Sequence, residues 1–200
     1  NFPSTLRYIG DFAFNATKLE MNQLVIPEGV EEINQYAFAF CRKLKAQVIL
    51  PSTIKKIGEW AVYGCPITSI NLPEGLESLG SLAFWDCDLR EVSIPSSCHE
   101  FNEGWQFGFN RNLEKMHLPE GMTEIPDHFA VDCFRLREVN FPHTLKHIGE
   151  KAFSLCISLK NVDLPLGMQS LGEEAFSELE ALEQIVFPAS MKSLGKNSCS

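Results

Sequence analysis

The chain has 200 residues, of which 44% are hydrophobic and 22% are charged, and this composition excludes a disordered or collagen-like protein. Its formal net charge is −9 without any basic run, which argues against a nucleic-acid or anionic-membrane partner. No apolar stretch approaches the roughly 18 residues that a membrane-spanning helix needs. The chain is therefore expected to fold around an apolar core and to bind neither nucleic acid nor lipid.

Proline recurs along the whole chain at intervals of 22 to 24 residues. The series comprises Pro3, Pro27, Pro51, Pro73, Pro95, Pro119, Pro142, Pro165 and Pro188. We name each unit by its proline and number its columns from that residue, so that column 9 lies nine residues after the proline. Columns 3 and 6 are mostly aliphatic, column 7 is commonly glycine, and columns 10 and 11 are commonly Ala-Phe. Several columns that recur at one period indicate stacked structural repeats.

The order of elements within one unit follows from the Pro142 unit. Residues 136–141 end in apolar and polar alternation, which predicts a short strand with one buried face. Pro142 then ends the strand because proline cannot donate a ladder hydrogen bond. Residues 145–149 form a second short extended piece, whose Gly149 is expected to permit a turn. Residues 150–156 suit one or two helical turns.

This pattern resembles the BspA-like leucine-rich repeats of bacterial surface proteins and some parasitic protists, over the whole chain. The resemblance implies an α/β solenoid, a right-handed leucine-rich-repeat superhelix of about 8 repeats of 22–24 residues. Its implied elements are short concave parallel strands, short second strands and short helical turns. We expect residues 1–200 to form a single solenoid domain. Because the pattern is cut at both ends, we also expect the array or a cap to continue beyond this chain.

Two neighbouring units depart from the pattern. The Pro95 unit has Cys98 in an aliphatic column, and Trp105-Gln106 stands where Ala-Phe is expected, so its helical piece is expected to be reshaped. In the Pro119 unit, Pro126 replaces the glycine of column 7, and Phe129-Ala130 inverts the Ala-Phe order.

The cysteines do not indicate a zinc site. Five of the seven share column 14 and are expected to form a buried ladder of free thiols, although a disulfide between Cys41 and Cys65 is allowed by the spacing of neighbouring repeats. These five are Cys41, Cys65, Cys87, Cys133 and Cys156. No C-x-x-C motif is present, and His143 and His147 lie outside any H-E-x-x-H pattern, so no metal is expected.

No residues indicate catalysis or a cofactor. The chain lacks a G-x-S-x-G elbow, a G-x-G-x-x-G loop and a phosphate-binding P-loop. The acidic run that starts at Glu173 lacks the alternating ligands of a calcium loop and is expected to be a solvated face. We therefore expect no enzyme activity.

Aromatic residues recur in columns 9 and 12 among the first five units, and later units have mostly polar residues in these columns. Tyr36 and Trp60 lie in column 9, whereas Tyr63, Trp85 and Phe107 lie in column 12. These columns flank the Ala-Phe pair, so the rings either form an apolar stripe for a partner or only seal the outside of the core. Tyr36, Trp60, Tyr63 and Trp85 are the predicted partner-binding residues.

A solenoid offers a long surface and few enclosed cavities. The predicted function is a non-enzymatic protein-binding or adhesion module, and the alternative is a structural spacer or stalk that presents another domain. The family resemblance implies a location at the cell surface or outside the cell. It also implies a protein partner on a host cell, a neighbouring cell or the matrix, while the mixed polar strand residues would also suit a glycan.

Overall fold

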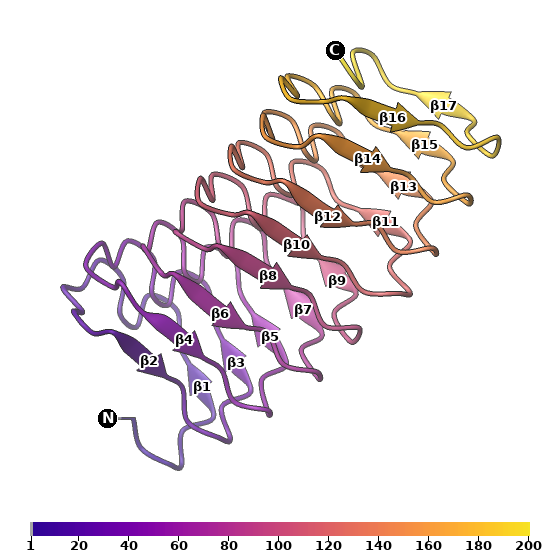
Figure 1. The fold of residues 1–200 in the computed structure, drawn as a ribbon. Helices are drawn as coiled ribbons and strands as arrows, with labels where there is room; N and C mark the ends of the chain where they lie inside the picture. The colour runs from indigo at the N-terminus through magenta and orange to yellow at the C-terminus, as the bar shows by residue number, and fades with distance from the viewer. Residues whose placement is uncertain (1) are drawn as a thin grey trace.

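The computed structural model describes residues 2–200, which form a stack of parallel coils (Figure 1). Within this range there are seventeen short strands and no helix. The strands form two rows that follow the stack from one terminus to the other (Figure 1). The structure is thus a β-solenoid of about eight turns, and each turn is one of the proline-marked units.

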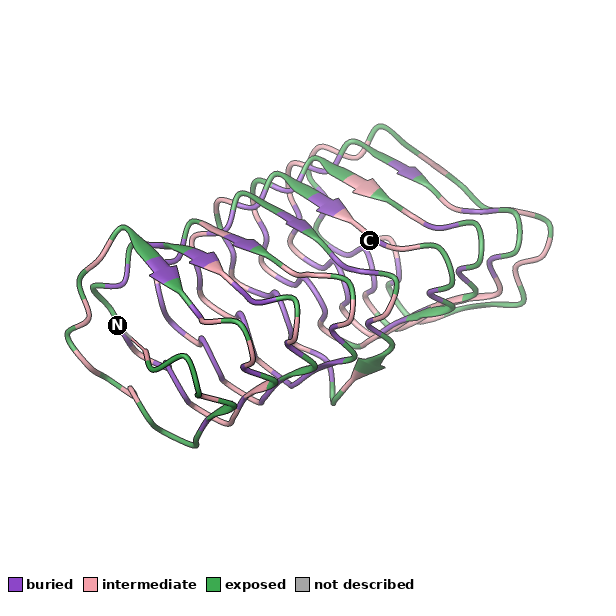
Figure 2. Ribbon diagram, turned by 90° about the horizontal axis from the view of Figure 1, so that it is seen from below, coloured by how far each residue is buried: buried purple, intermediate pink, exposed green. Residues whose placement is uncertain are grey.

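The first row contains the three-residue strands that precede the prolines. They are β2 (Gln23–Val25), β4 (Gln47–Ile49), β6 (Ser69–Asn71), β8 (Glu91–Ser93), β10 (Lys115–His117), β12 (Glu138–Asn140), β14 (Asn161–Asp163) and β16 (Gln184–Val186). In most of them the middle side chain is buried between outward-facing neighbours, as Figure 2 shows by colour. They pair in parallel as β2-β4-β6, β8-β10-β12 and β14-β16.

The second row contains two-residue strands at columns 5 and 6. They are β1 (Tyr8–Ile9), β3 (Glu32–Ile33), β5 (Lys56–Ile57), β7 (Ser78–Leu79), β9 (Glu100–Phe101), β11 (Glu124–Ile125), β13 (His147–Ile148), β15 (Ser170–Leu171) and β17 (Ser193–Leu194). They form two parallel sheets, β1-β3-β5-β7-β9 and β11-β13-β15-β17. Ile33 pairs with Ile57 and Ile57 with Leu79, so the column 6 side chains are superimposed in the core as predicted.

The prolines form the corner between the two rows. The N–H of Val30 donates to the carbonyl of Pro27 at 3.3 Å, which closes a four-residue turn. Gly29 occupies its third position with a φ of +98°, a backbone conformation that glycine adopts without strain. The proline therefore ends one strand and starts the turn that leads to the next.

The predicted helical turns at residues 150–156 and their equivalents are wrong. After column 7, alternate N–H groups donate to the next coil instead of to their own segment: Tyr36 to the Glu59 carbonyl at 3.0 Å and Phe38 to the Ala61 carbonyl at 2.8 Å. An α-helix would use these N–H groups internally. Tyr36 also has a left-handed φ of 55°, and its counterparts in column 9 share this conformation, which no helix allows. Pairing between coils thus replaces helix formation.

Glycine is needed in column 7 for a reason other than the predicted turn. Gly149 has no left-handed φ. A Cβ atom built on it would lie 2.7 Å from the carbonyl carbon of Pro126, and one on Gly80 would lie 2.5 Å from that of Gly58. The absence of a side chain therefore lets consecutive coils approach closely.

Candidate functional site

The aromatic columns lie on the irregular segment that joins the two strand rows outside the core. The structure orders this segment through the bonds between coils described above, so the rings are placed by the backbone ladder. Column 11 points inward, where Phe38 and Phe84 are fully buried, while the predicted residues Tyr36, Trp60, Tyr63 and Trp85 are all half-buried. Each predicted ring thus has a contact in the stack and an edge that faces solvent.

Tyr36, Trp60 and Tyr63 belong to one continuous cluster of rings. Tyr36 stacks on Phe12 with ring centroids 4.8 Å apart and on Trp60 with centroids 5.3 Å apart. Trp60 in turn contacts Tyr63 of its own coil at 4.4 Å, and Tyr63 meets Phe40 edge-on at 5.1 Å. Offset and edge-on contacts at these distances are favourable beyond the area they bury. Phe12, at the N-terminal end of the cluster, is 55% exposed.

Trp85 belongs to a second cluster. Its ring lies 5.2 Å from that of Trp105 and 4.8 Å from that of Phe109. Trp105 stacks on His128, with ring centroids 3.7 Å apart and planes within 7°. Gly108 makes room for this arrangement, because a Cβ at that position would lie 2.0 Å from the Trp85 ring. We call the two clusters together the aromatic face; it comprises Phe12, Tyr36, Phe40, Trp60, Tyr63, Trp85, Trp105 and Phe109.

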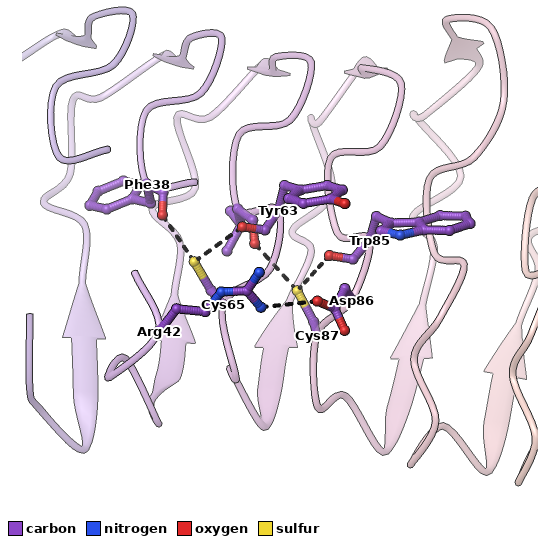
Figure 3. Close-up of polar contacts among 8 residues, drawn as sticks. Phe38, Arg42, Tyr63, Cys65, Trp85, Asp86 and Cys87 are labelled. Atoms are coloured by element: carbon purple, nitrogen blue, oxygen red, sulfur yellow. Dashed lines mark hydrogen bonds and ion pairs between the residues drawn. The ribbon is translucent and has the colours of Figure 1, made fainter. Parts of the chain in front are cut away.

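Two arginines accompany the aromatic face. Arg42 lies over the Phe40 ring at 5.5 Å and reaches across one whole coil to Asp86, with Nη1 and Oδ2 3.0 Å apart (Figure 3). Gly64 leaves room for this crossing, since a Cβ there would lie 3.1 Å from the guanidinium carbon. Arg111 lies over Phe109 at 5.3 Å. Arginine on aromatic rings at an exposed surface is typical of protein interfaces.

Four members of the aromatic face are not among the predicted partner-binding residues, and the prediction misplaced one further aromatic residue. The four are Phe12, Phe40, Trp105 and Phe109. Phe107, predicted in column 12, is fully buried and stacks on Phe84 at 5.6 Å. The Pro95 coil has one extra residue near Gly104, which moves Trp105 into column 9, Phe107 into the core column and Phe109 into column 13. The inference that Trp105-Gln106 replaces Ala-Phe is therefore wrong. The N–H of Phe107 donating to the Phe129 carbonyl at 2.9 Å fixes the true register.

The cysteine ladder lies beneath this face and is buried as predicted. All cysteines are free thiols, and each column 14 thiol donates to a carbonyl of the preceding coil: Cys65 to Phe38 at 2.9 Å and Cys87 to Val62 at 3.4 Å (Figure 3). Asn110 takes this place in the Pro95 coil, donating to Phe84 at 2.7 Å. Burial raises the pKa of the Cys133 thiol to about 12, so it remains a protonated donor. Most of the ladder is thus a structural device of protonated thiols. At its N-terminal end the pKa of the Cys41 thiol is instead lowered, chiefly by its hydrogen bond with Cys65.

The remaining predicted groups do not converge on a reaction site. His143 pairs with Glu120 at 3.0 Å, and His147 bonds to Ser170 at 2.7 Å on a different element. Within residues 2–200 no three side chains among His, Cys, Asp and Glu are arranged to hold a metal ion, and no helix could cross a membrane. A cavity of about 500 Å³ at the N-terminal end has no titratable side chain in its lining. It therefore lacks a general acid or base.

The repeated inner columns and variable outer columns define the class: a parallel β-solenoid of the leucine-rich-repeat type. The sequence profile of the BspA type leucine-rich repeat region matches six copies in residues 1–49, 40–154 and 124–200. The chain belongs to this family. Repeat families of this kind are typically non-catalytic binding modules. No curated protein matches the chain.

Solved structures with the same fold come from several bacteria. A leucine-rich repeat protein of Bacteroides ovatus is 31% identical with a TM-score of 0.85; the match covers 95% of this chain and 49% of that protein. The chain thus spans about half the length of that protein. The Treponema pallidum leucine-rich repeat protein is 28% identical with a TM-score of 0.72, over 81% of this chain and 78% of that one. A leucine-rich cell surface protein of Faecalibacterium prausnitzii shares the fold at 23% identity, with a TM-score of 0.54 over 96% and 66% of the two chains.

Proposed function

We propose that the chain is a non-enzymatic binding module that docks a partner protein through the aromatic face. The observation that carries the proposal is the position of eight aromatic residues in outer columns that the fold does not require to be aromatic. Lys151 and Glu174 occupy column 9 in later coils, where they form ion pairs with surface carboxylates or lysines. The rings are therefore a local addition to the repeat.

Tyrosine, tryptophan and arginine suit this role because they bury much area with little loss of conformational entropy. Here the rings are already held by stacking, so binding would order few side chains. The location proposed for this module is the cell surface or the exterior of the cell. The family and the cell surface protein of Faecalibacterium prausnitzii support that location. The partner would be a host, neighbouring-cell or matrix protein, or a glycan.

The alternative is a structural spacer or stalk. A spacer needs only the stack, and its outer columns would have the same average character along the whole array. The change from rings in the first coils to charged and hydroxyl side chains after His128 favours the binding module.

The test uses substitutions taken from the repeat itself. Leu82 fills column 9 and Val131 fills column 12 in native coils, so Trp60→Leu combined with Trp85→Val should preserve the stack while removing two indoles. The matched control, Lys151→Leu with Ser154→Val, places the same side chains in the same columns of a later coil. Both variants and the parent chain are assayed on purified matrix proteins and a glycan array.

We expect the indole variant to lose at least about tenfold in affinity for any component that the parent binds, while the control keeps it. Equal affinity of the parent and the indole variant, with matched thermal midpoints, would refute a role for the aromatic face. Lack of binding by the parent to any component would favour the spacer.

A further inference from the structure

The second strand row opens once along its length. β9 and β11 belong to different sheets, and no Cα atom of β9 lies within 8 Å of a Cα atom of β11. Neighbouring strands of a sheet are about 4.8 Å apart. The coils remain joined on both sides of the opening: β8, β10 and β12 pair continuously, and the N–H of Trp105 donates to the Asp127 carbonyl at 3.1 Å. The opening is therefore a slot between two connected coils.

Two local features of the sequence keep the slot open. Pro126 occupies column 7, where Gly58 and Gly149 donate their N–H to the preceding coil at 2.7 and 2.8 Å, and proline has no N–H to donate. In the Pro95 coil, the consecutive residues Glu103 and Gly104 both have left-handed φ angles, of 54° and 77°, and add the extra residue of that coil. The hydrogen bond from column 7 that would close the slot is therefore absent, and the Pro95 coil beside the slot is one residue longer.

The slot leaves two strand edges unpaired within the described residues. In the following pair of coils, Ile125 of β11 pairs with Ile148 of β13, and the carbonyl of Ile125 accepts from Gly149. The equivalent groups at the slot, the N–H and carbonyl of Phe101 and of Glu124, have no backbone partner across it. An unpaired edge is a template for another strand. A gap of two strand spacings, about 9.6 Å, would place one extended strand in contact with both edges.

The lining of the slot specifies the side chains that such a strand would carry. A cavity of about 260 Å³ lies there, with Cys98, Phe101 and Met122 as its apolar lining. The residues 95–105 and 118–128 that border the slot contain no lysine or arginine. They contain five exposed carboxylates, Glu100, Glu103, Glu120, Glu124 and Asp127. Of these, Glu124 lines the cavity itself, and Glu120 also pairs with His143. Because successive side chains of a strand point to opposite faces, apolar and cationic residues should alternate.

We propose that the slot between β9 and β11 binds an extended peptide strand in which small apolar residues alternate with lysine or arginine. Its main chain bonds to Phe101 on one side and Glu124 on the other, its apolar side chains cover Cys98, and its cationic side chains meet the carboxylates. The slot adjoins the aromatic face at Trp105, but the lining of its cavity shares no residue with that face. The substitutions that test one site therefore leave the residues of the other in place.

The experiment uses an acetylated and amidated heptapeptide of alternating lysine and valine as the probe. Binding is followed by amide NMR shifts and by hydrogen exchange of the whole chain. We expect slower exchange of the Phe101 and Glu124 amides, with no change at the paired amides of β5. A peptide with alternate backbone nitrogens methylated keeps every side chain but loses donors, and should bind at least about tenfold more weakly. An alternating glutamate and valine peptide should show a similar loss.

A closed variant tests the slot from the side of the protein. Pro126→Gly combined with deletion of Glu103 restores the donor and the length of the coil, and should abolish binding. The control Glu100→Gln with Glu124→Gln keeps the slot open and should retain weaker binding that depends less on salt. Unchanged Phe101 and Glu124 amides at millimolar probe, or equal binding of the methylated peptide, would overturn the proposal. The peptide comparison decides the matter even if the closed variant fails to fold.

Discussion

Trp60 and Lys151 occupy the same place in the early and late coils, and their backbones are the same. Their φ angles are 56° and 50°, and the N–H of each donates to the next coil at 2.9 Å. One carries a stacked indole and the other a half-buried lysine, whose ammonium group pairs with Glu174 at 3.5 Å. The stacking of coils therefore fixes the backbone and the inner columns. The outer side chains can therefore differ between the two halves, and a binding surface can form in the outer columns without disturbing the stack.

The strongest test of this comparison concerns the inner columns, where the two halves should respond alike. Ile57→Ala in the early coils and Ile148→Ala in the late coils each remove a buried rung of column 6. Each should cost about 2 to 5 kcal/mol of unfolding free energy, from lost burial and the cavity left behind. Urea titration with a common slope measures this. Lys146→Ala, at an exposed position, should cost under about 0.5 kcal/mol. Similar losses in all three variants would contradict the assignment of inside and outside.

The outer columns should separate the two halves. Trp60→Ser removes a half-buried indole that contacts both Tyr36 and Tyr63, and should cost about 2 to 3 kcal/mol. Lys151→Ser in the same column should cost under about 0.5 kcal/mol, because its ion pairs are only partly buried and remain in contact with solvent. Thermal unfolding monitored by circular dichroism compares the pair directly. Equal losses would mean that the rings add nothing to the stack.

The repeating inner columns explain what could be predicted from the sequence. Period, strands, prolines at corners and the thiol ladder follow from side-chain type, since each inner column has one environment in every coil. The helical turns could not be excluded in this way, because the hydrogen bonds that replace them join Tyr36 to Glu59 in another coil. Trp105 and Phe109 were missed because a single inserted residue shifts the columns. Its signal was available: Asn110 follows Phe107 at the interval that separates Cys41 from Phe38.

A smaller effect should come from the shared left-handed backbone. A residue other than glycine in this conformation is strained by about 1 kcal/mol. Glu174 has a φ of 53°, and its half-buried side chain contributes only a solvent-accessible ion pair with Lys151, so Glu174→Gly should raise the unfolding free energy by about 0.5 to 1 kcal/mol. Ala175→Gly, one residue later and fully buried without a left-handed φ, should instead lower it by about 1 kcal/mol. Chemical denaturation measures the change in unfolding free energy of both variants, which should be opposite in sign. A decrease in both variants would show that the backbone of column 9 is unstrained.

The smallest effect is expected at His128, where column 9 changes from aromatic to polar. Burial lowers the pKa of His128 below its ordinary value of 6.5, and its Nδ1 atom is buried without a hydrogen-bond partner. The unfolded chain therefore takes up this proton at a higher pH than the folded chain does. The contribution of the neutral ring to the free energy of unfolding is fully present above pH 6.5. It declines as the pH falls from there through the lower pKa of the folded state.

His128→Leu, which copies the native Leu82 of the same column, should flatten this decline relative to the parent chain. Unfolding free energies measured at intervals between pH 7.5 and pH 5 test it, with His143→Leu as the control, because His143 is almost fully exposed and pairs only with Glu120. An identical decline in the parent and the His128 variant would place the titrating group elsewhere. Such a result would also mean that the neutral form of His128 is not favoured by folding. His128 would then resemble the charged Lys151 of the next coil and would no longer count as the last stacked ring of column 9.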